Sequence, residues 1–154
     1  MQYILVLLGN IAFSVFGCPL DTTVSTSSGI ITGNARNEDG ILEFLGIPFA
    51  APPIGNLRWK PPQPVLDQHA NINATTFGPG CLSASPESGY SGTQSEDCLT
   101  LNVWSSSDDS NERRPVMVWL YGGGFQFGSS AQPNYNGTKL SQMGVVVVTF
   151  NYRL

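Results

Sequence analysis

The chain has 154 residues, enough for one domain of ordinary size. Seven Lys and Arg residues against eleven Asp and Glu residues give a formal net charge of −4, and the few cations are scattered. This pattern excludes a protein that binds duplex nucleic acid through a basic face. Only 12% of the residues are charged while Gly and Pro are frequent, which favours a chain of strands and loops over a helical bundle.

The chain begins with an uncharged apolar stretch from Tyr3 to Phe16, which is short for a membrane span. Its position and length are typical of a secretory signal peptide, with cleavage expected after Gly17. A buried apolar strand or helix is the alternative interpretation. We therefore expect residues 1–17 to be a signal peptide and residues 18–154 to be an incomplete domain. The protein is expected to be secreted, without a stable membrane span.

Three cysteines follow this stretch: Cys18, Cys81 and Cys98. In an oxidising compartment Cys81 and Cys98 form the natural pair. Such a disulfide closes a short loop and stabilises the fold by about 3 kcal/mol in the chain-entropy model. Cys18 is left as the mature N-terminus, a free thiol or part of the removed segment. Three scattered cysteines and one histidine lack the spacing of a metal site, so no metal is expected.

Two Asn-x-Thr triplets, beginning at Asn73 and Asn136, match the acceptor pattern for N-linked glycosylation. Such triplets are common by chance. The predicted signal peptide upstream is what makes both asparagines candidate glycosylation sites.

The segment from Gly29 to Ala50 has the pattern of a strand, a turn and a strand. Asp39-Gly40 is a strong signal for the turn of a β-hairpin. The proline-rich stretch from Pro48 to Pro64 predicts extended, irregular chain, because proline lacks an N–H donor and disfavours a helix. The polar segment between the two paired cysteines predicts a loop fixed at its base.

The later strands differ in their burial pattern. Leu99–Trp104 alternates and predicts a strand with one buried face, whereas Val116–Tyr121 and Val145–Phe150 are apolar on both faces. Strands of the second kind belong inside a sheet that helices cover on each side. Thr138–Met143 predicts one short helix, with Gly144 following its end. Helical layers are therefore largely missing, and we expect the front part of a larger α/β domain.

The central motif is an apolar strand that runs directly into three glycines, Gly122, Gly123 and Gly124. Glycine permits positive φ and close approach to the main chain, so successive N–H groups can converge on one developing negative oxygen. An acyl-transfer oxyanion hole needs this geometry. A dinucleotide-binding motif would require glycine where Phe127 stands, and a phosphate loop would require lysine where Ser129 stands. A plain tight turn after a strand is the remaining alternative.

Other segments carry a specific resemblance. They are FLGIPFA from Phe44, PPIGNLRW from Pro52, SEDCLTLNV from Ser95 and NYRL from Asn151, placed in order around the glycine loop. In these segments and their order, the chain closely resembles the N-terminal part of type-B carboxylesterases and cholinesterases. The resemblance implies an α/β-hydrolase fold, of which this chain holds a β-hairpin and the first strands of the central sheet.

The resemblance also implies a function: hydrolysis of a small carboxylic ester through a Ser–Glu/Asp–His triad and an acyl-enzyme, without a cofactor. Residue by residue, Gly123 and Gly124 match the oxyanion donors. Cys81 and Cys98 match the family's first disulfide. Arg58 and Glu96 match a structural ion pair, and we predict that they meet.

The triad itself does not occur in the sequence. There is no Gly-x-Ser-x-Gly, and the only histidine, His69, precedes the glycine loop, whereas the triad follows that loop in α/β-hydrolases. Ser129 and Ser130 are interpreted as loop hydroxyls. We therefore expect the oxyanion hole without the nucleophile, and no turnover from residues 1–154 alone.

The loop between the paired cysteines narrows the class of ester that we expect as substrate. It contains no Trp, and Tyr90 is its only aromatic residue. Because cholinesterases stack a Trp of this loop on the quaternary ammonium, a choline ester is disfavoured. The loop is also short and polar, unlike the amphipathic flap of family lipases. A general carboxylesterase remains, with a non-catalytic binding or adhesion protein and an inactive truncated product as alternatives.

Overall fold

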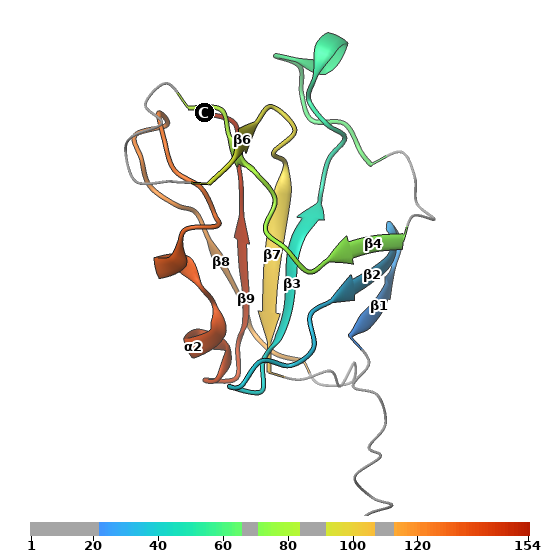
Figure 1. Cartoon of the computed structure of the whole chain (residues 1–154), viewed down its shortest axis with the longest axis vertical. Coiled ribbons are helices and arrows are strands. Elements are labelled where there is room, and N and C mark those ends of the chain that lie inside the picture. Colours follow the sequence, from blue (N-terminus) through green and yellow to red (C-terminus); the bar gives the residue numbers. More distant parts are fainter. Residues whose placement is uncertain (1–21, 66–70, 84–91, 107–112) are drawn as a thin grey trace, which may run out of the picture.

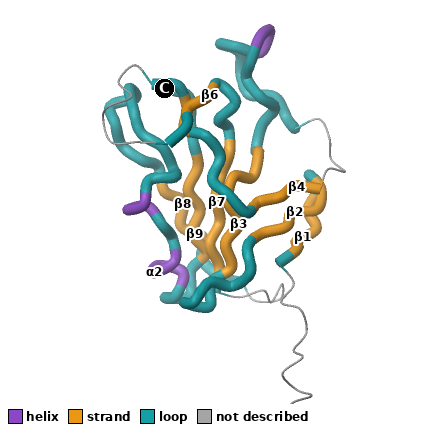
Figure 2. The backbone as a smooth tube through the Cα atoms, in the orientation of Figure 1, coloured by secondary structure: helices purple, strands orange, loops and turns teal. Residues whose placement is uncertain are grey.

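The computed structural model describes residues 22–65, 71–83, 92–106 and 113–154. The predicted signal peptide, Cys18, His69 and Tyr90 lie outside these residues. The regular structure of the described residues is mostly strand (Figure 1 and Figure 2). None of the described helices is long and apolar enough to cross a membrane.

The largest sheet has four strands in the order β3-β7-β9-β8. These strands span Leu42–Pro48 (β3), Thr100–Ser105 (β7), Val146–Phe150 (β9) and Val116–Trp119 (β8). β7 is antiparallel to both β3 and β9, whereas β8 and β9 are parallel. Parallel strands need a long crossover, and residues 120–145 provide it here. The carboxyl ends of β8 and β9 consequently lie at the same edge of the sheet, and the glycine loop begins there.

β7 confirms the strand that the alternating sequence pattern predicts. Thr100, Asn102 and Trp104 are buried on one face, while the intervening residues are only half-buried. The buried face packs Trp104 against Ile41 and Val147, so this strand sits at the centre of a hydrophobic cluster.

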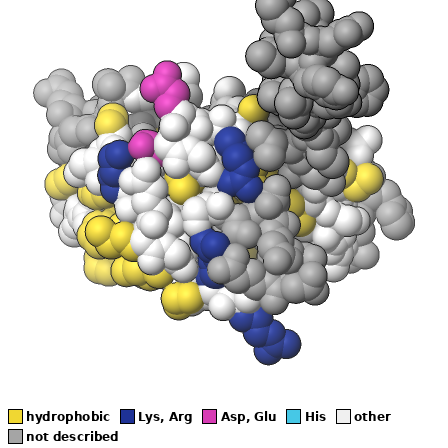
Figure 3. Space-filling model, turned by 90° about the horizontal axis from the view of Figure 1, so that it is seen from below, with side chains coloured by type: hydrophobic (Ala, Val, Ile, Leu, Met, Phe, Trp, Pro, Cys, Tyr) yellow, Lys and Arg dark blue, Asp and Glu magenta, His cyan; other side chains and the backbone are white. Residues whose placement is uncertain are grey.

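β8 differs from the prediction. Its sequence predicts burial on both faces, but all four of its residues are exposed, and Val118 keeps 54% of its surface accessible. β8 is the edge strand of the sheet among the described residues, and it pairs only with β9. From below, hydrophobic side chains gather toward the side of the molecule where β8 and α2 lie (Figure 3).

The turn near Asp39-Gly40 forms, but the predicted hairpin does not. The Asn37 side chain accepts hydrogen bonds from the N–H groups of Asp39 and Ile41, and Gly40 has a φ of 76°. The strands on either side then enter different sheets, joined by one isolated bridge between Asn34 and Glu43.

The preceding strand belongs to a second sheet with the order β1-β2-β4. Its strands span Thr23–Thr26 (β1), Gly29–Gly33 (β2) and Asn71–Ala74 (β4). The hairpin that forms in this region joins β1 to β2, and not β2 to β3. Packing explains the outcome, because Ile31 and Ala74 of this sheet form one hydrophobic cluster with Leu42 and Phe44 of β3. Apolar side chains of the two sheets are thus buried together, although β2 takes β1 and β4 as its pairing partners.

The remaining elements are short. They are η1 (Gly55–Leu57), β5 (Gly80–Cys81), β6 (Gln94–Ser95), η2 (Pro133–Tyr135) and α2 (Thr138–Ser141). The proline-rich stretch is irregular, as predicted, and contains η1 followed by a turn at which Trp59 has a φ of 63°. The predicted helix exists but ends two residues early, and Gly144 follows the last turn with a φ of 86°.

Candidate active site

The glycine loop leaves the end of β8 with an unusual backbone. Gly123, Gly124 and Phe125 all have positive φ, at 151°, 60° and 60°. A Cβ on Gly123 would lie 1.9 Å from the carbonyl oxygen of Phe127, so only glycine fits there. The Gln126 N–H donates to the Gly123 carbonyl at 3.0 Å and closes a tight turn.

This turn leaves two main-chain N–H groups available as hydrogen-bond donors. Within the part of the chain that the structure describes, the N–H groups of Gly123 and Gly124 donate to no acceptor. Gly124 is exposed, and nothing lies within 4 Å of the position that its Cβ would take. Phe125 holds its left-handed conformation although its side chain is 79% exposed. Such backbone strain is costly for a residue other than glycine and is concentrated at functional sites.

A buried polar network supports the loop from below. The Asn151 side chain accepts from the Ser130 N–H at 2.9 Å and from the Ser129 hydroxyl at 3.4 Å. Its amide donates to the carbonyl of Cys98 at 3.1 Å. Ser129 and Ser130 are thus structural loop hydroxyls, as their sequence context indicates, and among the described residues no acidic or basic side chain hydrogen-bonds to either.

Asn102 extends this network into the sheet. Its carbonyl oxygen accepts from the Gly46 N–H at 2.9 Å, at the bulge of β3. Its amide donates to the hydroxyls of Thr149 and Ser130. Because buried polar groups are costly unless they are bonded, these contacts fix the loop relative to three strands.

The disulfide between Cys81 and Cys98 confirms the predicted pair, with Cα atoms 5.0 Å apart. It anchors the segment that reaches the glycine loop, because the Ser83 hydroxyl donates to the Gln126 carbonyl at 2.8 Å. The disulfide loop and the glycine loop therefore support each other.

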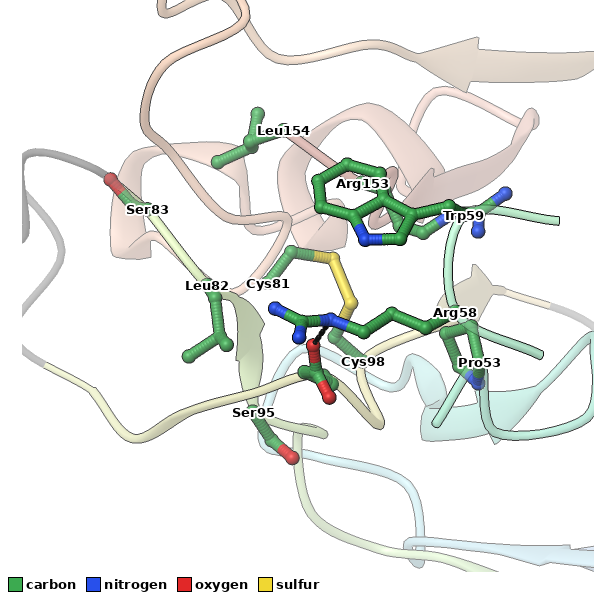
Figure 4. A pocket seen from close by; sticks show the side chains of 11 residues that line it. Pro53, Arg58, Trp59, Cys81, Leu82, Ser83, Ser95, Cys98, Arg153 and Leu154 are labelled. Carbon is green, nitrogen blue, oxygen red and sulfur yellow. Dashed lines mark ion pairs between the residues drawn. A yellow bond between two sulfur atoms is a disulfide. The ribbon is translucent and has the colours of Figure 1, made fainter. Parts of the chain in front are cut away.

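Arg58 forms an ion pair with Glu96, as the resemblance implies, and its guanidinium also lies over the Trp59 ring. The pair borders an open cavity of about 390 Å³ beside the disulfide (Figure 4). Trp59, Leu82 and Leu154 form its apolar rim. The residues that the structure describes contain no cluster of three groups able to hold a metal ion.

Two tyrosines that the sequence reasoning did not single out lie at the entrance of the loop. Tyr121 is buried beneath it, and burial raises the pKa of its phenol to about 12. Tyr152 stacks on it with ring centres 4.4 Å apart. Their only sequence signal is position: each stands two residues beyond the end of a parallel strand.

A model of the family described as "Carboxylesterase family" matches residues 20–154. The chain belongs to the carboxylesterase family. This chain is 48% identical over 130 residues to the fumonisin B1 esterase of Sphingopyxis macrogoltabida. That match covers 83% of this chain and 24% of the relative. It is also 41% identical over 136 residues to the para-nitrobenzyl esterase of Bacillus subtilis, covering 85% of this chain and 27% of that one.

Comparison with solved structures gives the same family. A para-nitrobenzyl esterase superposes on this chain with a TM-score of 0.78 and 40% identity, covering 87% of this chain and 28% of that one. A carboxylesterase of Geobacillus stearothermophilus gives 0.76 and 41%, with coverages of 86% and 27%. The fold is therefore that of the N-terminal part of an α/β-hydrolase. The chain spans about a quarter of the length of these relatives.

Proposed function

We propose that this chain supplies the oxyanion hole of a serine carboxylesterase that hydrolyses small carboxylic esters through an acyl-enzyme. The observation that supports it best is the pair of N–H groups at Gly123 and Gly124, which have no acceptor among the described residues and belong to a loop that a buried network holds in place. Family membership gives the reaction class. The absence of Trp between Cys81 and Cys98 favours a general ester over a choline ester.

The chemistry assigned to the loop is electrostatic. When a serine attacks the ester carbonyl, the carbonyl oxygen becomes negative, and two N–H donors aimed at it lower the energy of the transition state. One such donor is worth about 2.7–4 kcal/mol. Nucleophile, acid and histidine follow the oxyanion loop in α/β-hydrolases, and residues 125–154 contain no histidine. We therefore expect no turnover from residues 1–154 alone.

A substitution in the loop tests the proposal in the full natural protein. Gly123→Ala places a methyl group on the Phe127 carbonyl at a φ of 151°, so the loop must move. We expect kcat for p-nitrophenyl acetate to fall by about 10²–10³-fold, the loss typical of one oxyanion donor. Gly40→Ala is the matched control, because Gly40 also has positive φ but stands in open space outside the site.

The Gly40→Ala control separates the effect of displacing the glycine loop from the general effect of an alanine at positive φ. Full activity in Gly123→Ala would contradict the assignment of the oxyanion hole. A folded wild-type protein without hydrolysis sensitive to serine-directed inhibitors would contradict the enzyme itself and favour a non-catalytic binding protein on this fold.

We also propose that the protein is secreted, with residues 1–17 removed and with glycans on Asn73 and Asn136. Both asparagines are exposed, and the buried disulfide fits an oxidising compartment. Recovery from the culture medium, with a mobility shift on removal of N-linked glycans, is the expected result. Retention inside the cell without a shift would contradict it.

A further inference from the structure

Two tyrosines connect the ends of the parallel strands β8 and β9. Tyr121 follows β8 and Tyr152 follows β9, each two residues beyond the last strand residue. Their rings stack at 4.4 Å with an angle of 16° between planes. The Tyr152 hydroxyl donates to the main-chain carbonyl of Tyr121 at 2.6 Å, and the Tyr121 hydroxyl donates to that of Tyr152 at 3.3 Å.

The shorter of these bonds ends on the peptide unit where the glycine loop begins. Because a peptide unit is planar, holding the Tyr121 oxygen also holds the plane that contains the Gly122 N–H. A side chain at Gly122 would point into open space, since nothing lies within 4 Å of a Cβ built there. Glycine also has the widest choice of backbone conformations. The Tyr152 hydroxyl is therefore a contact that restrains the direction in which the loop leaves β8.

The other end of the loop rests on the same pair. A Cβ on Gly128 would lie 2.6 Å from the Tyr121 ring, so the ring fills the space beneath the returning chain. Phe125, at the tip, makes an edge contact with the Tyr152 ring, with centres 6.3 Å apart. Burial raises the pKa of both phenols, so each hydroxyl keeps its proton and remains a donor at neutral pH.

We propose that Tyr152 is a positioning residue: its hydroxyl fixes the Tyr121–Gly122 peptide plane and thereby aims the N–H groups of Gly123 and Gly124. The inference rests on the proposed function for its catalytic consequence. Its structural part, the hold of Tyr152 on the loop, can be measured independently of activity. A donor displaced by a fraction of an ångström loses much of its value in the transition state while substrate binding is retained.

The test is Tyr152→Phe in the full natural protein, which keeps the stacked ring and removes the hydroxyl. We expect kcat to fall about 10- to 100-fold with KM changed less than twofold, as for an interaction made only in the transition state. The affinity for a trifluoromethyl ketone, which mimics the tetrahedral oxyanion, should fall by a similar factor. Amide hydrogen exchange in residues 121–128 should accelerate about tenfold.

Tyr121→Phe is the matched control. It removes the reverse bond from the same stacked pair, but that bond ends on the Tyr152 carbonyl, outside the loop. Because Tyr121 also supports the loop through its ring, which this change keeps, we expect a smaller loss of kcat and a smaller acceleration of exchange in residues 121–128 than in Tyr152→Phe. Thermal midpoints of both variants show that each protein is folded.

The outcomes separate the two proposals. A loss of kcat and an acceleration of loop exchange that are both larger in Tyr152→Phe than in Tyr121→Phe support the positioning role. Unchanged exchange in Tyr152→Phe overturns it, and so does an equal loss of kcat and thermal stability in both variants, which would make the pair a simple packing contact. If the wild type hydrolyses no ester, the proposed function fails, and the exchange comparison by itself decides whether Tyr152 holds the loop.

Discussion

At the scale of single residues, the candidate site depends on where particular side chains are buried. Tyr121 is only 3% exposed, and its phenol lies beneath the glycine loop against the Tyr152 ring. Asn102 and Asn151 are 1% exposed, and their amides hydrogen-bond neighbouring loop and strand groups. These three buried side chains support the loop, whereas Gly123 and Gly124 leave their main-chain N–H groups available to a ligand.

The buried phenol of Tyr121 makes the stability of the fold depend on pH in the alkaline range. The pKa of its phenol is about 12 in the fold, against an ordinary value of 10.0, because burial disfavours the charged form. Its stabilising contribution is therefore complete below pH 10 and is lost as the pH rises through 12.

Urea unfolding at pH 8 to 12 measures this effect. Tyr121→Phe should lose less stability than wild type across that range, because it has no phenol to ionise. Parallel curves for the two proteins would show that ionisation of Tyr121 does not drive the alkaline loss.

At the scale of elements, the exposure of strand β8 bears on whether the chain associates with itself. Its sequence is apolar on both faces, yet Val116, Met117, Val118 and Trp119 are all about half exposed. β9 pairs with one side of it, and no other described strand pairs with the second side. An exposed, apolar edge strand is a template for pairing between copies of a chain.

We therefore expect the 154-residue chain to self-associate through β8. Val118→Lys should lower association, measured as light scattering against concentration, because a charge in an open edge opposes pairing. Val24→Lys is the matched control: Val24 is also an exposed strand valine, 44% accessible, but lies in β1 of the smaller sheet. Equal effects of the two substitutions would show that added charge, and not the β8 edge, controls association.

At the scale of the whole molecule, the described residues bury three small hydrophobic clusters instead of one large core. One of them is built around the disulfide, where Cys81 and Cys98 pack with Ala50 and Leu99. A fold with a divided core depends more than usual on covalent constraint.

Replacing both cysteines, as Cys81→Ser with Cys98→Ser, should lower the free energy of unfolding by about 3 kcal/mol. The disulfide joins residues 17 apart in sequence, and removing it frees that loop in the unfolded chain. Chemical denaturation with and without a reducing agent checks this expectation. The reductant should affect only the wild type, and a double variant as stable as the oxidised wild type would contradict the role given to the disulfide.

The sequence by itself determined what depends on local pattern and on recognisable motifs. Alternation predicted β7, the Asp39-Gly40 pair placed the turn, and the motifs indicated the family and the Cys81–Cys98 pair. Tertiary structure alone decided which strands pair, because β2 pairs with β4 from a distant part of the sequence while its apolar side chain Ile31 packs against those of β3. It also decided the contact between Tyr121 and Tyr152, which are far apart in sequence and meet only because β8 and β9 run parallel.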